Sequence, residues 1–291
     1  MRSTRKSLKE VIQTRGLARI MAAHNPLSAM LAEEAGFDGI WASGFELSAS
    51  LGLPDVSLVS MSEHLDTLRR IAQRTTLPIV ADVDTGYGNA INVLHTIEQY
   101  EAAGAAAVVI EDKTFPKVTS LVAGGRQELL RIEEFQGKIE AAVHARMDPE
   151  FLIIARDEAL IAGLGQDVAL ERAAKYAEAG ADMILIHSKQ NTPDEIESFI
   201  DACDDDIPIV IVPTAYPQMT EQRALALKKV KLLIYGNHAI RACVTAMQKV
   251  FAQIISDGGI EKVNADIVPV SEIFRLQNMD EVKVNEKRFL R

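Results

Sequence analysis

The sequence has few cysteines, a deficit of basic charge and no long apolar run, and each shortage excludes a class of protein. Its two cysteines, Cys203 and Cys243, have no C-x-x-C spacing, which fits a reducing compartment and excludes a cysteine-based structural zinc site. The formal net charge of -10 argues against a nucleic-acid or anionic-membrane surface, because such partners need a basic face. No apolar run reaches membrane-spanning length, and the N-terminus lacks a signal-peptide pattern. We therefore expect a soluble, cytoplasmic protein that binds neither nucleic acid nor membrane.

What the sequence does contain is a regular alternation of apolar runs and helical segments. Eight runs are typical of buried strands, at residues 18–23, 39–43, 78–84, 106–112, 151–157, 182–188, 208–213 and 231–237. Helical periodicity fills the intervals, and helices that end at glycine lead into strands without polar alternation, as in EAAGAAAVVI and EAGADMILI. This pattern predicts an α/β protein with a closed (β/α)8 TIM barrel.

Two further expectations concern fold and domains. A doubly wound open sheet is the alternative fold, but no G-x-G-x-x-G follows the first strand and polar residues end too many strands. We expect the barrel to occupy residues 1–258 and to end at Gly258 and Gly259. Residues 259–291 then form a C-terminal helical tail, with the apolar pattern VSEIFRLQ, that is too short for its own core. The tail should pack on the barrel or on a neighbouring subunit.

The stretch IVADVDTGYGN, residues 79–89, is the most informative part of the chain. An apolar strand here ends in Asp82 and Asp84, and Gly86 and Gly88 follow. Residues two apart on a strand point the same way, so the two carboxylates can share one target, of which Mg²⁺ is the simplest. A solvated loop start is the other interpretation, because D-x-D is a common pattern.

Active sites of such barrels lie at the carboxyl ends of the strands, and here most of those ends are polar. They carry His24, Asn25, Trp41, Ser43, Asp82, Asp84, Glu111, Asp112, Lys113, Arg156, Asp157, Glu158, His187, Ser188, Lys189, Thr214, Asn237 and His238. Burying so many charges without partners would be costly, so the pattern fits a bound cation beside a bound anion. For His24, Asn237 and His238, a purely structural role is equally expected.

Charge divides these candidates into two groups, and two flanking segments would complete a site. The acidic group suited to Mg²⁺ is Asp82, Asp84 and Glu111. The basic group suited to a phosphoryl or carboxylate group is Arg156, His187 and Lys117. The turn ASGFELSAS offers backbone N–H groups at Ser43, Gly44 and Phe45. The segment from Lys113 to Gly125, which we call the lid loop, ends in two glycines and is typical of a lid that closes over a substrate.

Eight motifs, spread in order over nearly the whole chain, resemble one known family. They are GIWASGFELSAS, ADVDTGYGN, EDKTFPKVTSL, GRQELLRIEEF, IARDEALIAG, ILIHSK, IVPTAYPQ and YGNHAIRA. Together they are similar to the phosphoenolpyruvate mutase and phosphonopyruvate hydrolase branch of the isocitrate lyase superfamily. The resemblance implies a barrel whose last helix is swapped between subunits and a homotetramer built as a dimer of dimers. It also implies Mg²⁺, with Mn²⁺ or Co²⁺ as substitutes, and a small phosphonate or keto-acid substrate.

The same resemblance implies roles for individual residues. Asp82 would bind Mg²⁺ directly, and Asp84 and Glu111 would contact it through water. The carboxylate and enolate end of the substrate would lie against Ser43, Gly44 and Phe45, beneath Trp41. The phosphonate end would meet Arg156 and His187, with Asp55 beside it and Lys117, Thr119 and Ser120 closing from the lid loop.

The sequence after the fourth strand distinguishes the branches of this superfamily. Its lyases carry K-K-C-G-H there, whereas this chain has EDKTFPKVTSL with no cysteine nearby. Mutases carry Asn-Ser five residues after E-D-K, whereas this chain has Thr119 and Ser120, which is the hydrolase pattern. A threonine hydroxyl can orient a water molecule, while an amide helps to exclude it. The resemblance therefore implies Mg²⁺-dependent hydrolysis of the carbon–phosphorus bond of phosphonopyruvate, with Asp55 or Thr119 positioning the water.

Three other functions stay open at this point. They are a mutase that interconverts phosphoenolpyruvate and phosphonopyruvate, a hydrolase of another keto acid such as oxaloacetate, and a non-catalytic binding barrel. One departure from the family pattern is Asp157, where an apolar residue is usual. Its carboxylate could weaken the contact of Arg156 with a phosphonate, or it could face away.

Overall fold

The computed structural model describes residues 7–120, 122, 124–125, 127–204 and 207–291. The chain divides into two compact units, Met1–Ile240 and Arg241–Arg291, which are described separately. The expected domain boundary near residue 258 stays a prediction.

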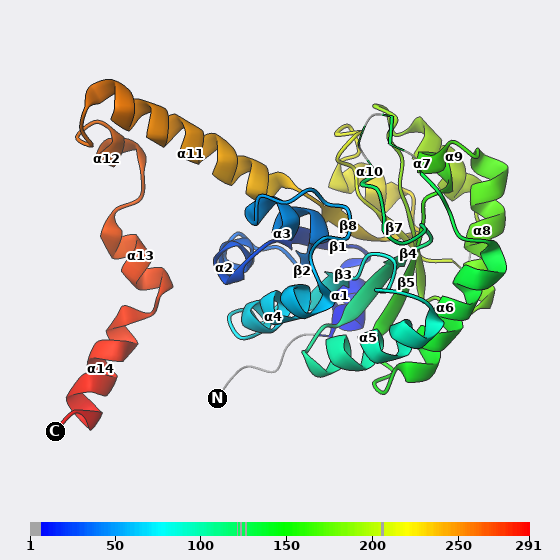
Figure 1. Cartoon of the computed structure of the whole chain (residues 1–291), viewed down its shortest axis with the longest axis horizontal. Helices are drawn as coiled ribbons and strands as arrows, with labels where there is room; N and C mark the ends of the chain where they lie inside the picture. The colour runs from blue at the N-terminus through cyan, green and yellow to red at the C-terminus, as the bar shows by residue number, and fades with distance from the viewer. Residues whose placement is uncertain (1–6, 121, 123, 126, 205–206) are drawn as a thin grey trace. The chain divides into compact units, whose positions relative to one another are not determined.

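The first unit is a closed barrel of eight parallel strands in chain order (Figure 1). The strands are β1 (Ala18–Ala23), β2 (Gly39–Ala42), β3 (Ile79–Asp82), β4 (Ala107–Glu111), β5 (Leu152–Asp157), β6 (Met183–Ile186), β7 (Ile209–Ile211) and β8 (Val230–Tyr235). Closure is direct, because β8 pairs with β1 and aligns Ile234 with Ile20. The predicted TIM barrel is confirmed, and the open-sheet alternative is excluded.

Helices surround the barrel and connect its strands (Figure 1). They are α1 (Leu8–Arg15), α2 (Pro26–Glu34), α3 (Gly44–Ser50), α4 (Met61–Ala72), α5 (Ala90–Ala102), α6 (Ile132–Ala145), α7 (Ala159–Ala162), α8 (Gln166–Glu178), α9 (Asp194–Ala202), α10 (Glu221–Ala226) and the start of α11 (His238–Asp257). Several begin at polar caps that the sequence supplies. Ser60 and Glu63, for example, form a reciprocal capping box at the start of α4.

Successive strand residues alternate between the barrel interior and the layer under the helices. On β5, Leu152 and Ile154 belong to the interior cluster, whereas Ile153 and Ala155 belong to the outer one. The same alternation sends Arg156 into the barrel and Asp157 outward. The Asp157 carboxylate is buried and its Oδ1 accepts a hydrogen bond from the N–H of Ala159 at 2.8 Å. The second alternative considered for Asp157 therefore holds: its side chain faces away from the substrate.

The second unit is helical and has almost no core of its own. It holds the remainder of α11, α12 (Val263–Asp266), α13 (Val270–Leu276) and α14 (Met279–Phe289). The predicted pattern VSEIFRLQ is α13, and the helical extension is confirmed, although α14 was not predicted. Its buried hydrophobic residues are Val263 and Leu276. Its exposed large ones are Val244, Met247, Phe251, Ile255, Ile260, Ile267, Val268, Val270, Ile273, Phe274, Val282, Val284, Phe289 and Leu290.

No helix in the part of the chain that the structure describes combines the length and the apolar character needed to cross a bilayer.

Candidate active site

A cavity at the carboxyl ends of the strands collects eleven of the thirteen predicted site residues. These eleven are Trp41, Ser43, Phe45, Asp55, Asp82, Glu111, Lys117, Thr119, Ser120, Arg156 and His187. The other two, Gly44 and Asp84, line a smaller neighbouring cavity, which also has Asp55 and Asp82 in its wall. The main cavity is also lined by residues that are not among these thirteen, namely Lys113, Val212, Thr214, Gly236 and Asn237.

Neighbouring strands bring the three predicted acids together. Asp82 ends β3 and Glu111 ends β4, and the N–H of Glu111 donates to the carbonyl of Asp84 at 2.8 Å. Asp84 lies beyond the strand with φ 50°, in the left-handed region, where the chain turns out of the barrel. A Cβ at Gly44 would lie 3.2 Å from Asp84 Oδ1 and 3.5 Å from Asp82 Oδ2. Glycine therefore keeps the start of α3 close to both carboxylates without crowding them.

This acidic group has the properties of a site for a divalent cation. All three acids are buried, and Glu111 Oε1 has no hydrogen-bond partner among the described residues. Burial raises the pKa of Asp84 to about 7, although the charge of Lys117 opposes the rise. Within the described residues, no set of three or more His, Cys, Asp or Glu side chains is arranged to hold a metal ion alone. A cation here would keep water or substrate oxygens among its ligands, as Mg²⁺ usually does.

Lys117 connects the lid loop to these acids. Its Nζ lies 2.6 Å from Asp84 Oδ1 and 3.1 Å from Asp55 Oδ1, and the side chain is only 4% exposed. Burial alone would lower the pKa of Lys117, but the surrounding carboxylates, Asp84 foremost, raise it well above its ordinary value. The ammonium group is therefore charged and holds this part of the lid loop against the acids.

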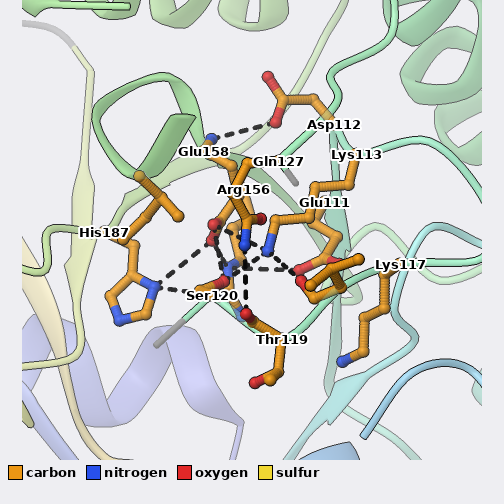
Figure 2. A network of polar contacts seen from close by, with 12 residues as sticks. Glu111, Asp112, Lys113, Lys117, Thr119, Ser120, Gln127, Arg156, Glu158 and His187 are labelled. Carbon is orange, nitrogen blue, oxygen red and sulfur yellow. Dashed lines mark hydrogen bonds and ion pairs between the residues drawn. The ribbon is translucent and has the colours of Figure 1, made fainter. Parts of the chain in front are cut away.

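Arg156 and His187 form the side of the cavity that suits an anion. Arg156 Nη2 donates to His187 Nδ1 at 3.0 Å and to Ser120 Oγ at 2.9 Å (Figure 2). Burial lowers the pKa of His187, so the ring is neutral near pH 7. Because Nδ1 accepts from the guanidinium, the proton of the neutral ring belongs on Nε2. His187 Nε2 is buried without a hydrogen-bond partner in the described part of the chain, and it can donate to a ligand.

The segment 113–129, which contains the lid loop, begins and ends at the same place. The carbonyl of Asp112 accepts from the N–H of Leu130 at 2.8 Å. Arg172 joins the two ends a second time, because it donates to Asp112 Oδ2 at 2.8 Å and to the carbonyl of Leu130 at 2.9 Å. Residues 121 and 123 of the lid loop lie outside the described residues, and its closing motion stays a prediction.

The turn expected at ASGFELSAS is in fact a short helix. Ser43 is the N-cap of α3, and its Oγ accepts from the N–H of Glu46 at 3.1 Å. The first N–H groups of a helix have no acceptor within it, so the amides of Gly44 and Phe45 suit an anionic oxygen, as expected for the turn. Glu46 in turn pairs with His24, with Glu46 Oε2 2.9 Å from His24 Nδ1. His24 therefore has the structural role considered for it.

Two residues that sequence analysis left without a role join the network around Arg156. Lys113 and Glu158 both contact Ser120, at 2.6 Å and 2.7 Å between the polar atoms (Figure 2). Their place at polar strand ends was the available signal, but it was shared with many other residues. Contacts across 38 positions of chain, as between Ser120 and Glu158, have no local pattern that would reveal them.

Comparison with known proteins gives consistent matches over almost the full chain. The phosphoenolpyruvate phosphomutase family model matches residues 8–255. A phosphonopyruvate hydrolase from Variovorax sp. (strain Pal2) is 57% identical and the match covers 98% of this chain and 99% of that protein. A phosphoenolpyruvate phosphomutase from Tetrahymena pyriformis is 44% identical over 99% and 96% of the two chains. A crystal structure of phosphonopyruvate hydrolase in complex with oxalate and Mg²⁺ superposes with a TM-score of 0.93 at 55% identity, covering 98% of each chain.

Replacing Lys117 by methionine should destabilise the metal-free protein in a pH-dependent way. At pH 8 we expect the free energy of unfolding to fall by about 3 kcal/mol, because Asp55 and Asp84 lose the cation between them. A raised acid pKa favours the folded state at low pH, and that contribution is lost as the pH rises through about 7. Without Lys117 the folded protein binds this proton more tightly, so the loss should be smaller at pH 6. Urea unfolding at both pH values measures the difference.

The matched control is Lys175→Met on the surface of α8. Lys175 pairs with Glu178 at 2.7 Å, but both side chains are largely exposed. Exposed pairs contribute less than about 1 kcal/mol, so this variant should stay close to the wild type at both pH values. Equal stability losses for the two variants would contradict the role assigned to Lys117.

Proposed function

This chain belongs to the phosphoenolpyruvate phosphomutase family, and we propose that within it the protein is a Mg²⁺-dependent hydrolase of phosphonopyruvate. The products are pyruvate and phosphate. The substrate is thus a small anion with a keto-acid end and a phosphonate end, which fits a cavity with one acidic and one basic side.

The full-length identity to the Variovorax hydrolase is the observation that carries this proposal. The chain is 57% identical to this hydrolase and 44% identical to the Tetrahymena mutase, and both matches cover almost the whole chain. The more similar of these two relatives is thus a hydrolase. Thr119 supports the same choice, because it lines the cavity at the position where the family resemblance implies asparagine in mutases. The mutase is the alternative, since it would use the same residues.

In this proposal the acids hold the metal ion, and the ion, when bound, supplies positive charge to the keto-acid oxygens and to the enolate. Asp82 would bind the ion directly, and Asp84 and Glu111 would contact it through water. The unpaired buried oxygen of Glu111 and the raised pKa of Asp84 support these assignments, because a cation would relieve both. Mn²⁺ or Co²⁺ would serve as substitutes.

The keto-acid end lies against the start of α3. There Ser43 lines the cavity, the amides of Gly44 and Phe45 donate to the developing enolate oxygen, and Trp41 covers the planar group. As the carbon–phosphorus bond breaks, its electron pair passes into the enolate. The carbon then takes up the proton that the attacking water gives up, and pyruvate results.

The phosphonate end lies among Arg156, His187 and Lys117. The two cations offset the negative charge of the phosphoryl group, while neutral His187 donates from Nε2. A water molecule attacks phosphorus on the side opposite the leaving carbon, and its oxygen ends in phosphate. Asp55 and Thr119 both line the cavity and are the two candidates to position that water, with Ser120 closing beside them.

We further propose that the protein is a homo-oligomer, a dimer of dimers whose last barrel helix is swapped between subunits. The second unit supports this, because Phe251 and Ile255 on α11 are 61% and 84% exposed in the single chain. Apolar surface of this extent marks an interaction site in soluble proteins. Sedimentation equilibrium should give about four times the 31.8 kDa chain mass, and a monomer at micromolar concentration would contradict the proposal.

A cytoplasmic location is proposed on the state of the cysteines. Both Cys203 and Cys243 are free thiols, as expected for a reducing compartment. Cell fractionation would test this location.

The experiment that tests the function follows phosphorus by NMR. Incubation with phosphonopyruvate and Mg²⁺ should convert the substrate signal into inorganic phosphate, with pyruvate formed in equal amount. Removing divalent cations with EDTA should abolish turnover, and Asp82→Asn should lower it by at least about 100-fold even with Mg²⁺ present. A phosphoenolpyruvate signal instead of phosphate would establish the mutase, and no conversion of either compound would refute both.

Thr119→Asn tests the choice between hydrolase and mutase at one residue. We expect kcat/KM for phosphate release to fall at least about tenfold, because the amide cannot place the water as the hydroxyl does. Thr114→Asn on the same loop is the control, since Thr114 contacts the carbonyl of Glu128 and does not line the cavity. Unchanged hydrolysis in Thr119→Asn would remove Thr119 from the mechanism and leave Asp55.

A further inference from the structure

Glu158 is a fully buried carboxylate that lies behind the wall of the cavity. It follows directly after β5 and precedes α7, and it is not among the lining residues. Its backbone N–H donates to Asp112 Oδ1 at 3.0 Å, so the end of β4 fixes the backbone at this point. A carboxylate with no exposed surface is retained only where its partners offset the cost of burial.

The partners of the Glu158 carboxylate come from two parts of the site, β5 and the lid loop, and the ring of His187 lies close by. Oε1 accepts from Arg156 Nε and lies 3.4 Å from His187 Nδ1. Oε2 accepts from Ser120 Oγ at 2.7 Å and lies 3.2 Å from Lys113 Nζ (Figure 2). Burial alone would raise the pKa of Glu158, but Arg156 and Lys113 hold it well below its usual range. The group is therefore an anion that joins the end of β5 to the lid loop, and it acts on His187 through Arg156, which donates to Nδ1 of that ring.

The hydroxyl of Ser120 uses all of its hydrogen-bonding capacity in this network. A serine hydroxyl donates one hydrogen bond and accepts two. Here it donates to Glu158, and it accepts from Lys113 Nζ at 2.6 Å and from Arg156 Nη2 at 2.9 Å. Lys113 Nζ also donates to the carbonyl of Val118 at 2.8 Å. The lid loop is thus held at Val118 and at Ser120. Lys113 contacts both points, and Glu158 contacts Ser120 and pairs with Lys113.

The same contacts orient the guanidinium that faces the phosphonate. Nε is taken by Glu158, and Nη2 by Ser120 and His187, so Nη1 is the nitrogen that remains for a ligand within the described network. Arg156 lies between two acids, because Glu111 Oε2 is 3.6 Å from Nε on the metal side. Without Glu158, the guanidinium would be drawn toward the acidic group and away from the phosphoryl position.

We infer that Glu158 is a positioning residue for carbon–phosphorus cleavage, which couples the orientation of Arg156 and His187 to the position of Ser120. The inference rests on the proposed function. Glu158 acts only through its neighbours, so it should matter for the phosphonate end of the substrate and not for the keto-acid end.

Glu158→Gln removes the charge of the side chain and keeps its shape. It tests whether Glu158 affects the phosphonate end of the substrate and not the keto-acid end. We expect kcat/KM for phosphonopyruvate to fall about 100-fold, with kcat lowered as well as KM raised, because misplaced binding groups slow the chemical step. Oxalate resembles the planar enolate end and has no phosphonate, so its Mg²⁺-dependent dissociation constant should change by less than about twofold. Glu150→Gln, an exposed residue before β5, is the matched control and should change neither quantity.

The outcomes separate a positioning role from a structural one. Equal losses of oxalate binding and turnover would mean that the variant damages the fold, and unchanged kcat/KM would mean that Glu158 is dispensable. Either result overturns the inference. Ser120→Ala gives a second measurement, because Glu158→Gln combined with Ser120→Ala should be little worse than Glu158→Gln alone. Losses that multiply would show that the two residues act independently.

A third readout keeps the test independent of the proposed function. Hydrogen exchange of the amides in residues 117–120 should become faster in Glu158→Gln and stay unchanged in Glu150→Gln. If the wild type releases no phosphate, the proposed function fails, yet this measurement still decides whether Glu158 holds the lid loop. Unchanged exchange in both variants would refute that part of the inference.

Discussion

Most charged side chains at the mouth of this barrel are buried beside a neighbour of opposite sign. Lys117 lies between Asp55 and Asp84, and Arg156 lies between Glu111 and Glu158. Isolated buried charges would cost several kcal/mol each, so neither the acidic nor the basic side chains of the site would be stable without the other group. Because the buried charges are already paired with one another, a bound anionic substrate needs an additional cation to offset its charge. This is the electrostatic reason for a metal-dependent site here.

The barrel and the part of the site at the strand ends could be predicted because the relevant signals are local. Strands buried on both faces appear as unbroken apolar runs, and a parallel barrel places all their carboxyl ends at one mouth. Asp82, Glu111 and Arg156 are the inward residues at three such ends, so reading the strand ends was enough to group them. The direction of the Asp157 side chain could be determined only from the structure, because a shift of one residue along β5 would turn it from the outside of the barrel to the inside.

The remaining features depend on contacts that no local pattern encodes. Glu158 gains its role from Ser120 on a loop of another βα unit, and the path of that loop is set by packing. The start of α3 was expected to be a turn, because seven residues with glycine and two serines give too short a helical pattern. In both cases the residue types were visible in the sequence, while the partner or the backbone geometry was not.

The closed base of the 113–129 segment has an evolutionary implication. Because its two ends meet at Asp112 and are joined again by Arg172, the intervening residues can change in length or composition without moving the strands. New activities can then evolve on such a barrel by changes in this one segment, while the strands and helices of the barrel are inherited unchanged.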